Sequence, residues 1–287
     1  MNTVLKAALW MTGAIASFSF MAVAGRELAG EYDTFEIMLY RSLVGTIIVL
    51  AVTACGNRWH EIRFDQYKQH FLRNLFHFTG QNLWFYAVAI VPLAQVFALE
   101  FTSPLWVVIL APLILGEKLT RVRAISAVFG FIGILIITRP NPDTFQFALL
   151  YAAAAAVFFA LTILLTKRLT RTNSITSILF FLTTLQLVFG LITAGYDGNI
   201  ALPTDQSLPY LFLVGCAGLL AHFCLTTALS IAPAAVVVPI DFARLPVIAI
   251  VAMFLYAEPL ELWVFVGAAV IFAANYLNIW HETRKPA

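Results

Sequence analysis

The chain repeats itself at a spacing of 141 residues, and this repeat constrains the fold more than any other feature of the sequence. Residues 87–119 align with residues 228–260, and ten of these 33 positions are identical. An apolar alphabet this narrow would give roughly two or three identities by chance. We therefore expect two copies of one structural unit, residues 1–141 and residues 142–287.

The apolar content of the chain is that of a membrane protein. Hydrophobic residues make up 61% of it and charged residues only 11%, whereas soluble domains carry about 25% charged residues. Ten apolar stretches are long enough, or nearly so, for the helix of about 20 residues that crosses a bilayer. The sequence predicts an all-α membrane protein with ten transmembrane helices, at residues 4–24, 36–55, 73–91, 93–115, 122–138, 145–166, 175–195, 208–231, 234–257 and 262–280.

Each copy of the repeat holds five of these spans. Because five is odd, the second copy starts on the opposite side of the membrane, which makes two inverted five-helix repeats. Residues 22–24 (Ala-Val-Ala) also resemble a signal-peptide cleavage site. The first span has a repeat partner, however, with Phe18 over Phe159, so we expect it to stay in the protein.

The distribution of basic residues indicates the orientation, because cytoplasmic loops are enriched in Lys and Arg. With the N-terminus inside, thirteen Lys and Arg fall in inside segments and only Arg26 and Arg139 in outside segments. Both termini are therefore expected in the cytoplasm. The thirteen are Lys6, Arg58, Arg63, Lys68, Arg73, Lys118, Arg121, Arg123, Lys167, Arg168, Arg171, Arg284 and Lys285.

The sequence carries no motif of a soluble catalyst or an ATP-driven pump. There is no Walker loop, GxGxxG, CxxC or paired-His helix motif, so we expect no cofactor, no metal and no nucleic-acid partner. The three cysteines, Cys55, Cys216 and Cys224, fall in or at the end of spans, and we expect no disulfide.

Four ionisable residues lie inside predicted spans, where such groups are costly and face a cavity or a partner. At about 1.5 Å per residue, Arg41 and Glu100 lie at one depth near the outer face. Asp241 lies near the inner face, and Arg244 lies near the midplane on the same helix face as Asp241. One interpretation is a pair of gates or a substrate and proton site. The other is two structural ion pairs, Arg41 with Glu100 and Asp241 with Arg244.

Polar and aromatic residues on two further spans are candidate cavity residues. In the third span, His77, Gln81 and Trp84 follow one another at i, i+4 and i+7, with Tyr86 nearby. This stripe could line a cavity and stack on a flat ligand, or pack between helices. His222 is the repeat partner of Gln81, and either relays protons or is a satisfied polar group. His77 is expected close to the inner interface.

Prolines single out two spans as bent. Such residues are tolerated in a transmembrane helix only where neighbours satisfy the freed backbone groups. We expect the spans at 93–115 and 234–257 to be the bent, moving pair, because they contain Pro104, Pro112, Pro239 and Pro246.

Several segments resemble the drug/metabolite transporter superfamily. They are FEIMLYRSLVG in the second span, FTSPLWVVILAPLILGEKLT at the end of the fourth and PAAVVVPIDFARLPVIAIVAMFLYAEP in the ninth. The resemblance is closest to the bacterial branch with two EamA units, in the group containing S-adenosylmethionine and riboflavin transporters. It implies a ten-helix basket with a central cavity in the bacterial cytoplasmic (inner) membrane. Glu117 and Glu258 match a family motif and are expected to make helix-end and loop contacts.

These features together predict a secondary transporter, not an enzyme. Its partners would be the lipid bilayer and a small polar or zwitterionic metabolite resembling S-adenosylmethionine, riboflavin or an amino acid, moved by alternating access. A membrane channel and a membrane-embedded enzyme are the alternatives. The substrate, the direction of transport, a proton or other coupling ion and the oligomeric state stay open.

Overall fold

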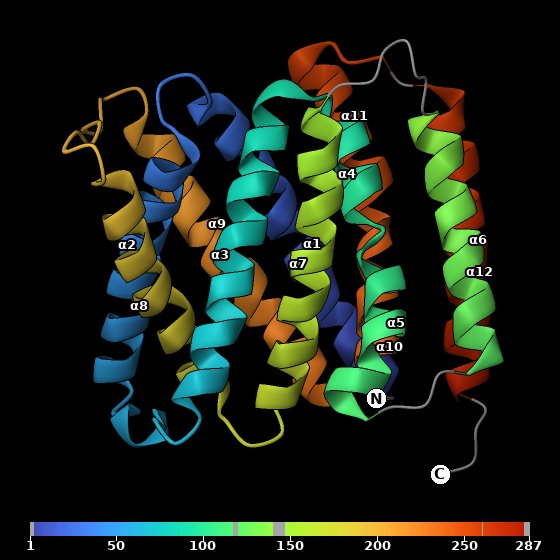
Figure 1. The fold of residues 1–287 in the computed structure, drawn as a ribbon, viewed down its shortest axis with the longest axis horizontal. Coiled ribbons are helices and arrows are strands. Elements are labelled where there is room, and N and C mark those ends of the chain that lie inside the picture. The colour runs from blue at the N-terminus through green and yellow to red at the C-terminus, as the bar shows by residue number, and fades with distance from the viewer. Residues whose placement is uncertain (1–2, 117–119, 140–146, 260, 284–287) are drawn as a thin grey trace.

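The computed structural model describes residues 3–116, 120–139, 147–259 and 261–283 of the chain. Within these ranges the framework is helical and contains no strand, as the sequence predicts. Figure 1 shows the helices standing side by side, with their axes roughly along one direction. The elements are α1 (Thr3–Leu28), α2 (Thr34–Cys55), η1 (Trp59–Glu61), α3 (Tyr67–Ile90), α4 (Leu93–Glu100), α5 (Ser103–Leu115), α6 (Arg121–Thr138), α7 (Ala148–Leu169), α8 (Ile175–Ala194), α9 (Leu208–Ile231), α10 (Ala234–Ile240), η3 (Asp241–Ala243), α11 (Arg244–Tyr256) and α12 (Leu262–Thr283).

Length and apolarity mark seven helical segments of the described chain as candidate membrane spans. They are α1, α2, α7, α8 and α9, the combined α4–α5 segment and residues 236–256. Two shorter apolar stretches lie in α6 and α12. Helix α3 is long enough but carries many polar residues, which explains why apolarity does not select it. The chain is thus a multi-pass membrane protein.

The molecule is apolar outside and partly polar inside. Large apolar side chains such as Leu113 and Phe254 are 81% and 77% exposed, whereas His70, Asn74 and Gln186 are fully buried. Soluble monomers rarely expose extended apolar surface. Apolar surface is favourable in contact with lipid. The polar side chains that the protein buries instead can form an internal site.

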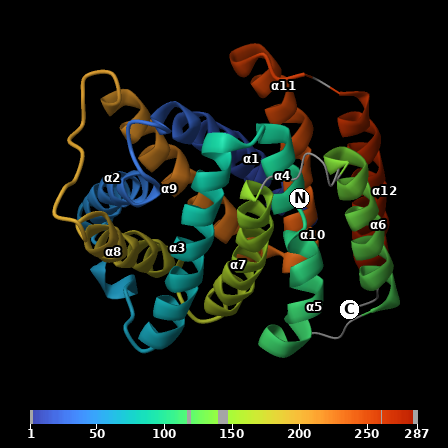
Figure 2. The same cartoon turned by 45° about the horizontal axis from the view of Figure 1, so that its top comes forward.

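Helix boundaries recur at the spacing of the sequence repeat. Helices α3 and α9 begin and end 141 residues apart, and so do the α4–α5 and α10–α11 segments. The packing joins the halves, because α1 packs on α9, α3 on α7, α2 on α8 and α6 on α12. Figure 2 shows the α6 and α12 pair at one edge and the α2 and α8 pair at the other.

Two long helical segments are broken near their middles, where the sequence predicts bends. The first breaks at Phe101 and Thr102, between α4 and α5, and Pro104 lies in the first turn of α5, where its missing N–H leaves no bond unmade. The second passes from α10 through the 3-10 helix η3 into α11. Short 3-10 stretches within a helix often mark hinges. That these segments move stays a prediction.

A carboxylate at the end of α11 ties together three separate helix ends. Glu258 accepts a hydrogen bond from the backbone N–H of Leu93 at 3.0 Å and pairs with Arg26 at 2.8 Å. The Arg26 guanidinium also lies 5.0 Å from the ring centre of Tyr256. The predicted helix-end contact of Glu258 is therefore confirmed. Its repeat partner Glu117 lies outside the described residues.

Candidate functional site

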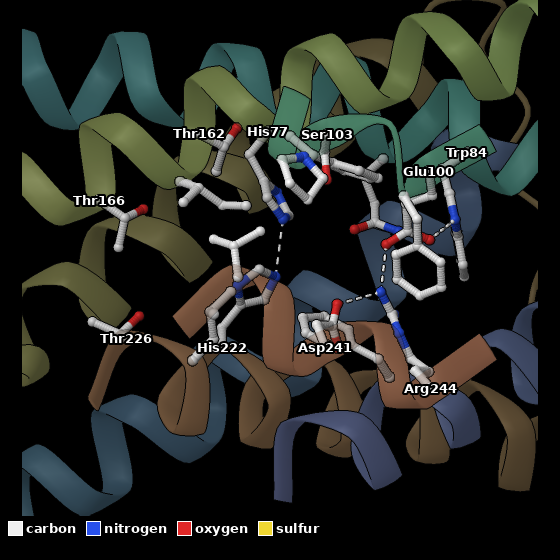
Figure 3. A pocket seen from close by; sticks show the side chains of 18 of the residues that line it. His77, Trp84, Glu100, Ser103, Thr162, Thr166, His222, Thr226, Asp241 and Arg244 are labelled. Carbon is white, nitrogen blue, oxygen red and sulfur yellow. Dashed lines mark hydrogen bonds and ion pairs between the residues drawn. The ribbon is translucent and has the colours of Figure 1, made fainter. Parts of the chain in front are cut away.

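A cavity lies between the two halves of the molecule and is bordered by residues from both. Helices α1, α3, α7 and α9 and both broken segments contribute to its wall. Figure 3 shows three polar groups along it: Thr166 and Thr226 at one end, His77 and His222 in the middle, and Glu100, Asp241 and Arg244 at the other end.

The two helix breaks bring two acids to one arginine. Glu100 is the last residue of α4, Asp241 opens η3, and Arg244 is the first residue of α11. One guanidinium nitrogen of Arg244 donates to Glu100 at 2.5 Å and to Asp241 at 2.7 Å. Trp84 donates from its indole N–H to the other oxygen of Glu100 at 2.7 Å. The repeated acids thus meet across the interface of the halves.

Aromatic rings enclose the arginine of this cluster. The Arg244 guanidinium lies 4.8 Å from the ring centres of Phe18 and Phe97 and 5.4 Å from that of Phe101. Such cation–π contacts hold the guanidinium in place. With both carboxylates ionised, the acid–arginine cluster carries one net negative charge. A proton or a cationic group of a bound molecule can neutralise it.

A histidine pair forms the middle of the cavity. Nε2 of His77 lies 2.9 Å from Nε2 of His222, and Gln186 donates to Nδ1 of His77 at 2.5 Å. A neutral His77 therefore carries its proton on Nε2 and donates it to His222. This leaves the proton of a neutral His222 on Nδ1, where no described protein atom accepts it. His222 thus keeps a free donor for water or a ligand.

Two buried arginines, Arg41 and Arg73, are connected to the histidine pair by hydrogen bonds through Gln186 and Asn74. Arg41 donates to the amide oxygen of Gln186 at 3.4 Å. Arg73 donates to Thr166 at 3.1 Å and to Asn74 at 2.8 Å. Arg41 is 5% exposed and Arg73 is 2% exposed. Among the described residues, neither has a carboxylate partner.

The predicted ion pair between Arg41 and Glu100 is wrong, whereas the pair between Asp241 and Arg244 is present. Helix α2 packs against α8 and α9, and α4 packs against α7 and α11. Arg41 therefore lies against α9, where a side chain at Gly218 would collide with its guanidinium. Equal depth in the membrane did not imply lateral contact.

The cavity unites six of the eight predicted site residues. They are Gln81, Trp84, Glu100, His222, Asp241 and Arg244. Arg41 is not among the lining residues, and Tyr86 is 46% exposed, with its ring against Tyr151. Tyr86 follows Trp84 by two residues, about 200° around the helix, so it points away from the cavity.

Arg73 and His77 also line the cavity, although neither is among the eight predicted site residues. Helix α3 begins at Tyr67, six residues earlier than predicted. Arg73 therefore lies inside α3 and not in the loop before it, and the side chains of Arg73 and His77 are 2% and 1% exposed. That His77 lies close to the inner interface stays a prediction. The available signal was the stripe itself, since Arg73 precedes His77 by four residues and lies on the same helix face.

Known proteins resemble this chain over most of its length. The pattern of the EamA-like transporter family matches residues 5–139 and again residues 146–280. The chain is 28% identical to the S-adenosylmethionine uptake transporter of Rickettsia felis, over 99% of this chain and 97% of that protein. It is 31% identical to the riboflavin transporter of Vibrio cholerae, over 98% of this chain and 95% of that protein.

The fold also has a counterpart among solved structures. One crystal structure aligns with a TM-score of 0.74 at 17% identity, covering 97% of this chain and 98% of the other. At this level of identity the likeness concerns the fold alone.

Proposed function

The chain belongs to the EamA-like transporter family, and from that premise we propose that it is a secondary transporter of a small polar metabolite. The observation that carries the proposal is the cavity between the halves, in which both helix breaks present charged residues. Broken helices that line a central site are typical of secondary transporters. The cavity is therefore assigned as the substrate site.

The architecture is that of two inverted five-helix units, residues 1–141 and residues 142–287. One match to the family pattern falls within each unit. We count α4–α5 and α10–α11 as one span each and include α3, α6 and α12, so that the described helices make up the ten spans of this proposal. Because each unit then crosses the membrane five times, the units have opposite orientations, and rocking of one against the other exposes the cavity to each side in turn. The protein lies in the cytoplasmic membrane with both termini inside.

The substrate is a small metabolite with more than one polar group. The named functions of the relatives support this class, since S-adenosylmethionine and riboflavin are both small, polar and partly aromatic. The site itself supports it through one acid–arginine cluster and one pair of histidines within a single cavity. Coupling to a proton is consistent with two carboxylates that share one arginine.

Transport into proteoliposomes tests the proposal. Vesicles loaded with unlabelled S-adenosylmethionine, riboflavin, an amino acid or a nucleoside are diluted into the labelled compound, and accumulation of label is followed. A transporter gives saturable uptake that the internal substrate accelerates. A channel gives flux that grows linearly with concentration and shows no such acceleration. A membrane-embedded enzyme gives a chemically altered product, which chromatography detects.

The first prediction concerns Asp241 as the coupling residue. Asp241→Asn keeps the size of the side chain but removes its charge, so the Glu100–Arg244 pair is left neutral and no longer needs a proton. We expect driven transport to fall by at least 10-fold while exchange of substrate across the membrane persists.

Both activities are measured in proteoliposomes of matched protein content, with Tyr86→Phe on the outer face of α3 as control. Wild-type driven transport in Asp241→Asn would exclude this carboxylate from coupling.

A further inference from the structure

Charge is distributed unevenly along the cavity. At one end the acid–arginine cluster of Glu100, Asp241 and Arg244 has a net charge of −1 when ionised. At the other end Arg73, with Arg41 behind it, contributes two positive charges without a carboxylate among the described residues. Burying an unpaired charge is expensive. Two buried positive charges without a carboxylate partner therefore favour the binding of an anion at that end of the cavity.

Arg73 is the member of this pair that faces the cavity. It lines the cavity wall, and its hydrogen bonds to Thr166 and Asn74 use Nε and one terminal nitrogen. No described protein atom accepts from the other terminal nitrogen. Arg41 does not line the cavity but is connected to Arg73, because Gln186 bonds to both Arg41 and Asn74. Its charge therefore adds to the positive potential at this end.

Arg244, by contrast, is already neutralised. One of its terminal nitrogens bonds to two carboxylates, and three aromatic rings enclose its guanidinium. An incoming anion would meet the two acids first and be repelled. Of the two arginines that line the cavity, Arg244 is thus the less free to bind an anionic group.

We propose that Arg73, together with Thr166, forms a subsite for an anionic group, a carboxylate or a phosphate, carried by the transported molecule. The inference rests on the proposed function and narrows the substrate class to molecules that carry an anionic group. The substrate then lies along the cavity with its acid group at Arg73, its body beside His77 and His222, and its neutral or cationic part at the acid–arginine cluster. A guanidinium binds such oxyanions through parallel hydrogen bonds.

The experiment compares pairs of probes that differ by one acid group. The pairs are S-adenosylmethionine with its decarboxylated form, flavin mononucleotide with riboflavin, and methionine with methioninamide. Their dissociation constants are measured by calorimetry on the purified full-length protein in lipid nanodiscs. Because a hydrogen bond to a charged group contributes about 1.5–3 kcal/mol, we expect the acid-bearing member to bind about 10- to 100-fold more tightly in at least one pair.

Variants of Arg73 assign that preference to its charge. Arg73→Gln should reduce the ratio of the two dissociation constants to near one, chiefly by weakening the acid-bearing member. Arg73→Lys keeps the charge and should retain most of the preference, which also guards against a folding defect in the glutamine variant. Arg58→Gln is the matched control, because it makes the same change at an exposed arginine of the loop before α3 and should leave the ratio unchanged.

Four outcomes would overturn the subsite. A wild-type protein that binds both members of every pair equally lacks it, although the transporter assignment stands if the probes still exchange in proteoliposomes. Loss of affinity for both members in Arg73→Gln, with the ratio kept, makes Arg73 structural. Binding that strengthens for both members when chloride replaces gluconate assigns the site to a free inorganic anion. If no probe binds or exchanges, the subsite and the proposed function both fail.

Discussion

At the scale of single residues, one buried arginine, Arg244, pairs with two carboxylates. Glu100 and Asp241 both accept hydrogen bonds from Arg244, and each lies at a helix terminus, Glu100 at the end of α4 and Asp241 at the start of η3. Removing a partner from a buried pair costs about 3–5 kcal/mol, since the other charge is left uncompensated. Arg244 compensates two such charges, so it should be the most sensitive member of the cluster.

A double-mutant cycle on Glu100 and Arg244 tests this sharing. We expect Arg244→Gln to lower stability by about 3–5 kcal/mol, and Glu100→Gln to lower it less, since Asp241 still pairs with the arginine. The loss of stability in the double variant should be smaller than the sum of the two single losses by about 0.5–3 kcal/mol, the range for contacting residues.

Chemical unfolding in detergent micelles measures the cycle. The same cycle on Arg41 and Glu100, which lie on helices whose main packing partners differ, is the control and should be closer to additive. Equal coupling in both cycles would mean that the effect is a general response to lost charge.

At the scale of elements, the two broken segments end in the same conformation. The residue that follows α5 is Gly116 with φ of 69°, and the residue that follows α11 is Ala257 with φ of 52°. Both lie in the left-handed region, where a glycine is unstrained and an L-residue with a side chain costs roughly 1–2 kcal/mol. The two positions are 141 residues apart. The left-handed turn therefore recurs with the repeat, but glycine, the residue that favours it, is present only in the first copy.

Ala257→Gly should therefore stabilise the protein. The gain is expected at about 0.5–1 kcal/mol, because the greater freedom of glycine in the unfolded chain offsets part of the relieved strain. The midpoint of thermal unfolding should rise by one to a few degrees, on the order of what such a free energy gives in a domain of this size.

The reverse change at the partner position, Gly116→Ala, serves as control and should lower the midpoint. A lower midpoint in Ala257→Gly would show that the methyl group of Ala257 contributes packing that outweighs its strain.

At the scale of the whole molecule, the orientation predicted from basic residues can be measured directly. In a chain with Cys55, Cys216 and Cys224 changed to serine, Arg63→Cys lies in the exposed loop before α3 and Asp197→Cys in the exposed loop after α8. With the N-terminus inside, position 63 faces the cytoplasm and position 197 faces outward. A membrane-impermeant maleimide on intact cells should modify only position 197.

Permeabilised cells, in which both positions should react, are the control for access. Labelling at position 63 in intact cells would show that the protein has the opposite orientation, with every helix crossing the membrane in the other direction.

The apolar runs and the internal repeat of the sequence were sufficient to predict much of this architecture. Nine of the predicted spans start within a few residues of the helices, because long apolar runs leave little choice in lipid. The predicted start of α3 was six residues too late, since polar residues such as Lys68 and His70 end an apolar run without ending a helix. Repeat register also aligned Glu100 with Asp241, but the partner of Arg41 required lateral packing, which spacing along one helix does not encode.

The single arginine between two repeated acids has a consequence for the origin of such a chain. The residue that corresponds to Arg244 in the first repeat is Ser103, which borders the same cavity. A dimer of two identical subunits would place either two arginines or two serines there, and neither choice matches one cation to two acids. Fusion of duplicated genes removes that restriction, because each half can then diverge alone. The odd charge at the centre is thus a property that two identical subunits could not have.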